Sequence, residues 1–197
     1  VVDADAIDEI AQGLKDADLI GFSSMTGYAD ITRRVIHRVR ELRPDVLMVW
    51  GGIHPTTAPE NAITADVDAI CTGEGEFAFE QFLSLAKEGR DYTKVENFWF
   101  KRGEDVIRNG FLPLMTTAQM ESLPFPQYGE KEKIYREGKG FEPMAFADYV
   151  VHGGQDYSTL WSIGCPFRCS YCGNTKFIEN DPNYTKIRHP SARYIVD

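Results

Sequence analysis

The sequence lacks three features that would decide its class at once: a long apolar run, an excess of basic residues and a dense set of cysteines. No apolar run approaches the ~20 residues that span a bilayer, so we expect no transmembrane segment. The 197 residues carry 21 Lys and Arg against 30 Asp and Glu, a formal charge of −9. This balance argues against a surface that coats nucleic acid or an anionic membrane. The acidic N-terminal residues also lack the basic and apolar regions of a signal peptide.

The four cysteines are too few for a scaffold held by disulfides, and they are unevenly placed. Cys71 stands alone, whereas Cys165, Cys169 and Cys172 lie within eight residues of one another. Closely spaced cysteines of this kind favour a metal or cluster site in a reducing compartment over structural disulfides. We therefore expect a cytoplasmic protein. Cys71 by itself is most simply a small buried hydrophobic residue.

The first 110 residues alternate between helical and strand patterns. Apolar residues at helical spacing occupy 7–14 and 31–42, and Pro44 follows the second of these helices. Continuous apolar runs at 19–22, 46–50 and 67–71 are typical of strands buried on both faces, and a third helix is expected to end near Gly89. A hairpin is expected at 98–107. The pattern predicts an α/β fold with a doubly wound parallel sheet.

The rest of the chain divides into two further parts. Residues 111–156 are rich in proline and glycine and are expected to form an irregular surface linker with little secondary structure. A strand is expected at 157–162, directly before the cysteines. One strand–helix unit of a (β/α) barrel takes roughly 30 of about 250 residues. Residues 157–197 would therefore hold only the start of such a barrel. The 1–110 domain is likewise expected to lack a strand and helix at its N-terminal side.

The segment Cys165-Pro-Phe-Arg-Cys169-Ser-Tyr-Cys172 can bring three thiolates to one inorganic centre. A [4Fe–4S] cluster normally takes four thiolates, so three would leave one iron open to another ligand. The CxxxCxxC spacing, the aromatic residue before the third cysteine and the upstream strand resemble the radical S-adenosylmethionine (SAM) superfamily. The resemblance implies that the three cysteines ligate the cluster, that SAM chelates the open iron, and that Tyr171 lies near its adenine. It also implies an electron donor such as flavodoxin or ferredoxin.

Structural zinc is the alternative reading of the same cysteines. Zinc usually takes four protein ligands, and His152 or His189 could supply the fourth. Zinc knuckles favour paired Cys-x₂-Cys units, however, and only Cys169 and Cys172 form one. The spacing therefore favours the iron–sulfur cluster.

Three loops at predicted strand ends carry glycines and hydroxyls. Ligands of open α/β sheets bind beyond the carboxyl ends of the strands, and glycine permits close approach of the backbone to a flat ligand. Each loop also has a structural explanation: a turn at the glycines, a helix cap at the hydroxyls, a favourable dipole contact for Glu74 and Glu76, and a hydrogen-bonded loop position for His54. The candidate residues are Ser23, Ser24, Thr26, Gly51, Gly52, His54, Gly73, Glu74 and Gly75.

The order of these loops, GFSS, then RPDVLMVWGGIHPTTAPE, then VDAICTGEGEFAFEQFL, resembles the cobalamin (B12)-binding domain that precedes the barrel in one large group of radical SAM proteins. The resemblance covers roughly residues 5–110. It implies that Ser23, Ser24 and Thr26 lie around the corrin and its nucleotide tail, that Gly51, Gly52 and His54 approach tail or ring, and that 73–76 close the site. The sequence departs from one variant of the family, because it holds no Asp-x-His-x-x-Gly motif for an axial histidine.

The leading functional reading is a cobalamin-dependent radical SAM methyltransferase that acts on an unactivated carbon of a small-molecule substrate. A second reading keeps the cofactors but assigns cyclisation or rearrangement, such as anaerobic closure of a porphyrin-ester ring. Methylthiotransferases are disfavoured, since their first domain needs three further cysteines and only Cys71 is present there. The non-enzymatic reading is an α/β binding module with a zinc-stabilised tail. By itself, this stretch of chain is not expected to be active.

Overall fold

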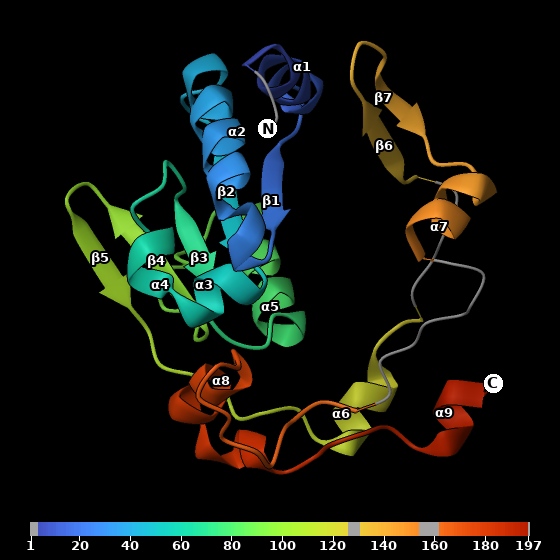
Figure 1. Ribbon diagram of the computed structural model, residues 1–197. Helices are drawn as coiled ribbons and strands as arrows, with labels where there is room; N and C mark the ends of the chain where they lie inside the picture. The colour runs from blue at the N-terminus through green and yellow to red at the C-terminus, as the bar shows by residue number, and fades with distance from the viewer. Residues whose placement is uncertain (1–3, 126–130, 154–161, 197) are drawn as a thin grey trace.

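A computed structural model of the chain describes residues 4–125, 131–153 and 162–196 (Figure 1). Its main sheet has five strands in the order β1-β2-β3-β4-β5. The strands are β1 (Leu19–Ser23), β2 (Leu47–Gly51), β3 (Ala69–Cys71), β4 (Phe98–Arg102) and β5 (Asp105–Arg108). The first three are parallel, with Phe22 opposite Trp50 and Trp50 opposite Ile70, while β4 and β5 are antiparallel to their neighbours. The helices of this part are α1 (Ala4–Leu14), η1 (Thr26–Tyr28), α2 (Ala29–Leu42), α3 (Ile53–Thr57), α4 (Pro59–Ala62) and α5 (Glu76–Lys87).

The sheet is covered by helices on both faces, because side chains of a strand alternate between the two sides. On β2, Met48 and Trp50 pack with α1 and α2, whereas Val49 packs in a second cluster with Phe82 of α5. All four side chains are at most 4% exposed. In the second cluster Phe82 stacks on Phe98 with 5.3 Å between ring centroids. Each face of the sheet therefore has its own hydrophobic core.

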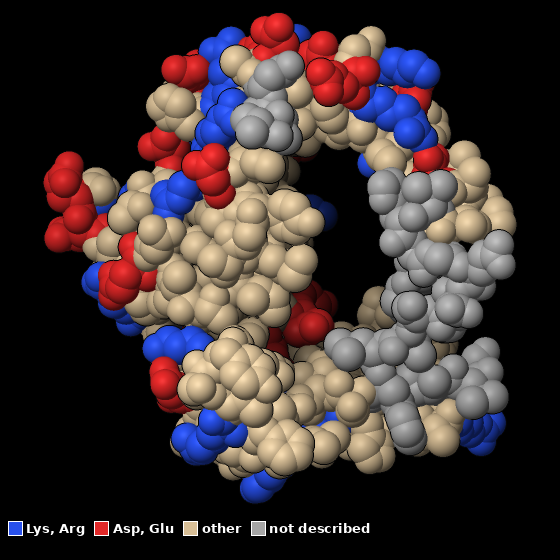
Figure 2. Space-filling view, viewed as in Figure 1, with Lys and Arg blue, Asp and Glu red and all other residues tan. Residues whose placement is uncertain are grey.

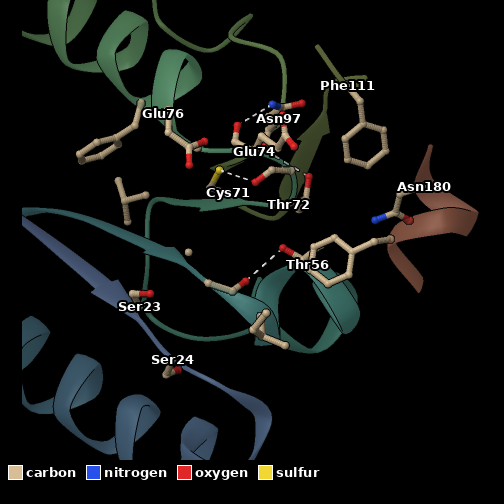
Figure 3. Close-up of a pocket in the computed structure, with 18 of the residues that line it drawn as sticks. Ser23, Ser24, Thr56, Cys71, Thr72, Glu74, Glu76, Asn97, Phe111 and Asn180 are labelled. Atoms are coloured by element: carbon tan, nitrogen blue, oxygen red, sulfur yellow. Dashed lines mark hydrogen bonds between the residues drawn. The ribbon is translucent and has the colours of Figure 1, made fainter. Parts of the chain in front are cut away.

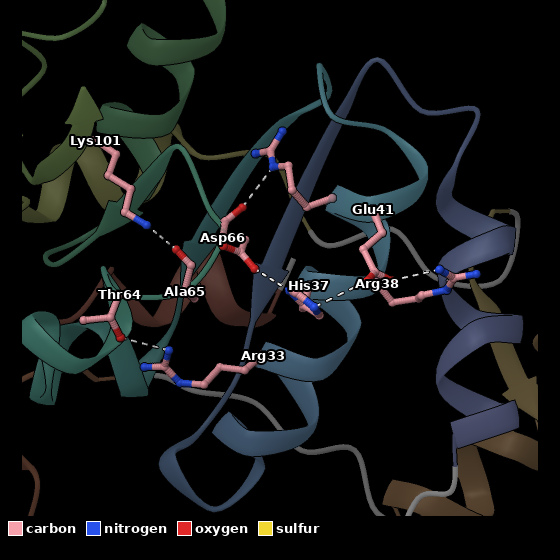
Figure 4. A network of polar contacts seen from close by, with 9 residues as sticks. Arg33, His37, Arg38, Glu41, Thr64, Ala65, Asp66 and Lys101 are labelled. Carbon is pink, nitrogen blue, oxygen red and sulfur yellow. Dashed lines mark hydrogen bonds and ion pairs between the residues drawn. The ribbon is translucent and has the colours of Figure 1, made fainter. Parts of the chain in front are cut away.

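Polar contacts tie α2 to the segment that leads into β3 (Figure 4). His37 Nδ1 lies 2.7 Å from Asp66 Oδ2, and Arg40 donates to Asp68 Oδ2 at 2.8 Å. Arg33 donates to Thr64 Oγ1 at 3.1 Å and also to Asn61. These contacts therefore tie α2 to residues 61–68, which lead into β3.

The predicted α/β class is confirmed, with one difference in the sheet. The helices at 4–14, 29–42 and 76–87 and the strands at 19–23, 47–51 and 69–71 lie where the apolar patterns predict them. The predicted hairpin forms too, but it extends the same sheet, because Ala69 pairs with Phe100 and Cys71 with Phe98 in antiparallel register. The sheet is therefore mixed rather than purely parallel.

The expectation of an irregular linker at 111–156 is wrong for its described residues. They form α6 (Thr117–Ser122), the hairpin β6 (Lys133–Arg136) with β7 (Gly140–Pro143), and α7 (Phe146–Gly153). Thr116 caps α6 in a capping box with Gln119, a signal that is readable in the sequence. The hairpin packs against α1, and Tyr135 Oη donates to Glu9 Oε2 at 2.7 Å.

The C-terminal segment runs beneath the sheet in Figure 1 as α8 (Asn174–Asn180), η2 (Pro182–Thr185) and α9 (Ala192–Val196). The strand expected at 157–162 lies almost wholly outside the described residues. Just after it, Ile163 and Arg188 form an isolated antiparallel bridge. Helix α8 contacts α3, so this segment meets the strand ends. In the parts of the chain that the structure describes, no helix is long and apolar enough to cross a membrane.

Candidate functional site

A cavity of about 1020 Å³ lies at the carboxyl ends of β1, β2 and β3 (Figure 3). Seven of the residues singled out in the sequence line it: Ser23, Ser24, Gly51, Gly52, Gly73, Glu74 and Gly75. Parallel strands end at one edge of a sheet, so three loops far apart in the sequence meet there. Two other candidates, Thr26 and His54, are not among the lining residues.

The loops after β1 and β2 approach each other closely at Gly52. This glycine has a φ of +89°, and a Cβ there would lie 2.8 Å from Ser23 Oγ and 2.9 Å from the Ser24 nitrogen. The Ser24 carbonyl accepts the backbone N–H of His54 at 3.0 Å. The Ser24 hydroxyl accepts the indole N–H of Trp50, also at 3.0 Å. Glycine at position 52 is therefore needed for the contact between these two loops.

His54 lies behind the cavity in a polar cluster of its own. Its side chain is buried, its Nε2 is 3.1 Å from Asn61 Oδ1 and its Nδ1 is 3.4 Å from Thr26 Oγ1. Its ring also packs on Trp50, with 5.0 Å between centroids. Burial lowers the pKa of His54, with a smaller contribution from the charge of Arg33. His54 is thus a neutral histidine that connects α3 to the loop after β1.

Asn97 fixes the third loop, and sequence reasoning missed it. Its amide donates to the Glu74 carbonyl at 2.7 Å, its side-chain oxygen accepts from the Leu112 nitrogen at 2.8 Å, and its carbonyl accepts the Thr72 N–H at 2.7 Å. Asn97 is buried and has a φ of +64°, a conformation that asparagine tolerates better than most residues. A Cβ on Gly73 would lie 2.7 Å from it. No local sequence signal marks this residue.

The walls of the cavity are largely apolar. Three of the described lining residues are acidic, Glu74, Glu76 and Asp181, and none is basic. Figure 2 shows a broad uncharged surface beside the central opening, an acidic patch at the edge of that opening, and most other charged groups along the outer border. A phosphate-rich ligand would need cationic donors at such a place. The lining therefore favours a large ligand with apolar surface and neutral or cationic polar groups.

Residues on either side of the cysteines in the sequence complete the cavity. Ile163, Phe177, Asn180, Asp181 and Tyr184 all line it. The nearest of them to the thiols in sequence is Ile163, two residues before Cys165. None of these five residues is a candidate in the sequence, because their contacts with the glycine-rich loops join segments more than 80 residues apart. The segments that flank the cysteine loop therefore border the candidate ligand pocket.

The cysteine loop itself is partly open. Cys165, Cys169 and Cys172 are free, half-buried thiols, and Tyr171 is 90% exposed and lies away from the cavity. The Cys169 carbonyl accepts the Cys172 N–H at 3.1 Å and the Thr175 hydroxyl at 2.8 Å, which starts α8. Three uncommitted thiols on one short loop are a donor set that suits an iron–sulfur cluster.

The loop is not closed around a common point. In the described ranges, no three His, Cys, Asp or Glu side chains are grouped closely enough to hold a metal ion. His189, one of the two histidines considered as a fourth zinc ligand, has its Nδ1 2.8 Å from the Pro190 carbonyl. The His152 side chain is outside the described part. Binding of either metal would require the loop to close.

The sequence is similar to a known domain family and to several characterised enzymes. Residues 1–83 match the family model of the B12 binding domain. The chain is 28% identical over 180 residues to the anaerobic magnesium-protoporphyrin IX monomethyl ester cyclase of Synechocystis sp., covering 90% of this chain and 33% of that protein. It is 28% identical over 171 residues to the cobalamin-dependent radical SAM methyltransferase TokK of Streptomyces tokunonensis, covering 84% and 23%. The chain thus spans a third or less of these relatives.

The fold is shared with a solved structure. The radical SAM methyltransferase TsrM from Kitasatospora setae, determined with cobalamin and a [4Fe–4S] cluster bound, matches 100% of this chain and 43% of its own at a TM-score of 0.66 and 19% identity. This likeness shows the fold alone. It confirms the predicted α/β fold, which is of the type found in B12-binding domains.

Proposed function

We propose that this chain, which carries a B12-binding domain and is related to cobalamin-dependent radical SAM enzymes, is the part of such an enzyme that holds cobalamin beside the cluster loop. One observation carries the proposal: the cavity at the strand ends is lined both by the glycine-rich loops and by residues that flank the cysteines. A carbon radical must be quenched close to where it forms, so cofactor pocket and cluster loop have to share one site.

Cobalamin would occupy the cavity, where it would supply a transferable methyl group. The backbone at Gly51, Gly52 and Gly73 admits a broad flat ligand, and the hydroxyls of Ser23 and Ser24 are available to its amide groups. The lack of basic lining residues in the described part suits a ligand rich in amides. Because His54 faces away, the described residues offer the cavity no histidine, which supports base-off binding without an axial histidine from this chain.

Cys165, Cys169 and Cys172 would hold a [4Fe–4S] cluster, which would supply the electron that cleaves SAM. With three thiolates, one iron stays open for the amino and carboxylate groups of SAM. Tyr171, next to the last thiol and 90% exposed, is free to meet the adenine. The proposed reaction is methyl transfer to an unactivated carbon of a small molecule, with flavodoxin or ferredoxin as reductant. The proposed domain organisation is a cobalamin-binding domain at 1–110, a linking segment at 111–156 and the start of the radical SAM barrel at 157–197.

Cyclisation is the second candidate, and one observation favours it. The Synechocystis relative is a cyclase and matches 90% of this chain. Both reactions use the same described residues, so the cavity alone does not separate them. A transfer of label from methyl-labelled SAM to product distinguishes methylation from ring closure.

Anaerobic reconstitution with iron and sulfide tests the cluster. We expect broad visible absorbance and about four irons per chain, as for a [4Fe–4S] centre. The variant Cys169→Ala should lose both, while Cys71→Ala should keep them. One bound zinc per chain and no colour would instead support the zinc-stabilised module. Titration with hydroxocobalamin tests the pocket separately, and its failure would remove the methyl-transfer proposal but not the cluster.

A further inference from the structure

Glu74 and Arg188 form a short ion pair between the two halves of the site. Arg188 Nη2 donates to Glu74 Oε1 at 2.6 Å, and Nη1 donates to Oε2 at 3.2 Å. The Arg188 side chain is 14% exposed and that of Glu74 is 18% exposed. A two-point contact between guanidinium and carboxylate fixes orientation as well as distance. The pair is therefore a rigid connection, unlike an exposed pair of mobile side chains.

The Glu74 end of this pair belongs to the pocket. Glu74 lies in the loop between β3 and α5, which lines the cavity (Figure 3). Its Oε2 also accepts the Met115 N–H at 2.8 Å, and Arg188 Nη1 donates to the Met115 carbonyl at 3.1 Å. Both carboxylate oxygens are thus used within the protein. Met115, in the segment between β5 and α6, is therefore held by both members of the pair.

The Arg188 end belongs to the cysteine loop. Its backbone N–H donates to the Ile163 carbonyl at 2.8 Å, and its carbonyl accepts the Ile163 N–H at 2.9 Å. Cys165, two residues further, donates its N–H to the Tyr184 carbonyl at 3.0 Å. Between them Gly164 has a φ of +119°, and a Cβ there would lie 3.0 Å from the Tyr184 carbonyl oxygen. The start of the thiol loop is therefore held by backbone hydrogen bonds to η2 and to the segment that follows it.

We propose that Glu74 and Arg188 are positioning residues, which set the place of the thiol loop relative to the ligand pocket. Arg188 holds the start of the loop with its backbone and the pocket loop with its side chain. Glu74 accordingly acts through Arg188 rather than on a bound ligand. That this placement of the thiol loop matters for catalysis rests on the proposed function. The connection between the two loops through Glu74 and Arg188 does not rest on it.

Hydrogen exchange of single amides, followed by NMR in the chain without cofactors, tests the link. Arg188→Met and Glu74→Gln should each speed exchange of the Ile163 and Arg188 amides by about tenfold or more, because each leaves a partly buried charge unpaired. The double variant should exchange more slowly than Arg188→Met, since it leaves no unpaired charge. Arg188→Lys, which keeps the charge, should restore part of the protection.

Arg108→Met is the matched control. Arg108 also pairs with a distant glutamate, Glu60, but at 2.9 Å on the surface, with 49% and 68% exposure. Its removal should leave the Ile163 and Arg188 amides unchanged. Protected amides in β2 report that every variant is folded. The proposal would be overturned if these two amides exchanged at the same rate in Arg188→Met, Glu74→Gln and the control. It would also be overturned if the increase in exchange rate in the double variant equalled the sum of the increases in the two single variants.

A second readout uses the loaded chain. With hydroxocobalamin bound and reduced to the paramagnetic Co(II) form beside a reduced cluster, the relaxation of the Co(II) signal in electron paramagnetic resonance reports their separation. Arg188→Met should slow this relaxation at unchanged iron content, and Arg108→Met should not. Relaxation unchanged in Arg188→Met would contradict the positioning role. If the unchanged chain takes up neither cofactor, the proposed function fails, and hydrogen exchange still decides the link.

Discussion

The Trp50 indole donates to Ser24 Oγ at 3.0 Å, so a core residue of β2 holds the pocket loop that follows β1. Trp50 is fully buried, and its N–H loses this partner if the hydroxyl is removed. We expect Ser24→Ala to lower the free energy of unfolding by about 1–3 kcal/mol, the cost of a buried unpaired donor. Urea unfolding followed by tryptophan fluorescence measures it. Ser23→Ala removes a neighbouring hydroxyl for which no hydrogen bond is seen among the described residues, and should cost less than half as much.

Gly52 should be the least replaceable glycine of the pocket. In Gly52→Ala the new methyl group meets Ser23 and Ser24 at under 3 Å, and its φ of +89° disfavours any side chain. Backbone strain of this kind costs about 1–3 kcal/mol, and the clash adds to it. We expect a loss of at least about 2 kcal/mol together with loss of hydroxocobalamin binding. Gly27→Ala, where no atom lies within 4 Å, should remain near the unchanged protein in thermal unfolding.

Protonation of His54 should weaken the fold in mild acid. Burial lowers its pKa in the folded chain, so the unfolded chain binds the proton more readily. The contribution of neutral His54 to stability is complete above its ordinary pKa of 6.5 and is lost as the pH falls through the lower folded value. His54→Gln should flatten this part of the curve of unfolding free energy against pH. A steeper fall below pH 6.5 in the variant would contradict the assignment.

His37 should show the opposite dependence. The hydrogen bond with Asp66 is the main cause that raises its pKa, with charge contributions from Asp66 and Glu41. Its stabilising contribution is complete below 6.5 and is lost as the pH rises through the raised folded value. The effect is small because the side chain is 66% exposed, and 1 M salt should reduce it. NMR titration of the His37 and His54 ring protons should find one pKa above 6.5 and the other below.

The four thiols should divide three to one in reactivity. Cys71 is buried, and burial raises its pKa to about 11, so at pH 8 about one thousandth of it is thiolate. Iodoacetamide should label Cys165, Cys169 and Cys172 in the folded chain, and Cys71 only after unfolding. Mass spectrometry of digests reads the sites. Reconstitution with iron and sulfide should protect the same three cysteines from labelling. Labelling of Cys71 in the folded chain would contradict the prediction, because it would show that the thiol is accessible without unfolding.

The sequence predicts the α/β part well because its signals are local. The apolar run at 46–50 and the helical spacing of Val35 and Val39 are set by neighbours within one element, and burial bears them out. Loops at the ends of parallel strands must meet at one edge, which explains why Ser23, Gly52 and Gly73 could be grouped without a structure. That β4 joins β3 depends on pairing across the chain, which no local pattern encodes.

The site is predicted less completely, because its remaining parts depend on distant contacts. The sequence offers His54 both as a hydrogen-bonded loop residue and, through the resemblance, as a residue near the ligand, and its contacts with Asn61 and Trp50 agree with the first. Asn97 and Arg188 carry no motif, and their importance comes from partners at Glu74. The prolines and glycines of 111–156 predict irregular structure, whereas the capping box at Thr116 is a local signal for the helix that forms there.

The two outer strands of the main sheet differ in what they present along their free edges. Strand β5 reads Asp-Val-Ile-Arg and ends in charged side chains, whereas β1 reads Leu-Ile-Gly-Phe-Ser and carries none. Within the described residues β1 pairs only with β2, so one row of its amide and carbonyl groups stays without a strand partner. An edge strand without charged side chains is a template for pairing with the edge strand of another molecule. Preparations of this polypeptide will accordingly favour self-association in concentrated solution, beginning at β1, unless another strand shields it.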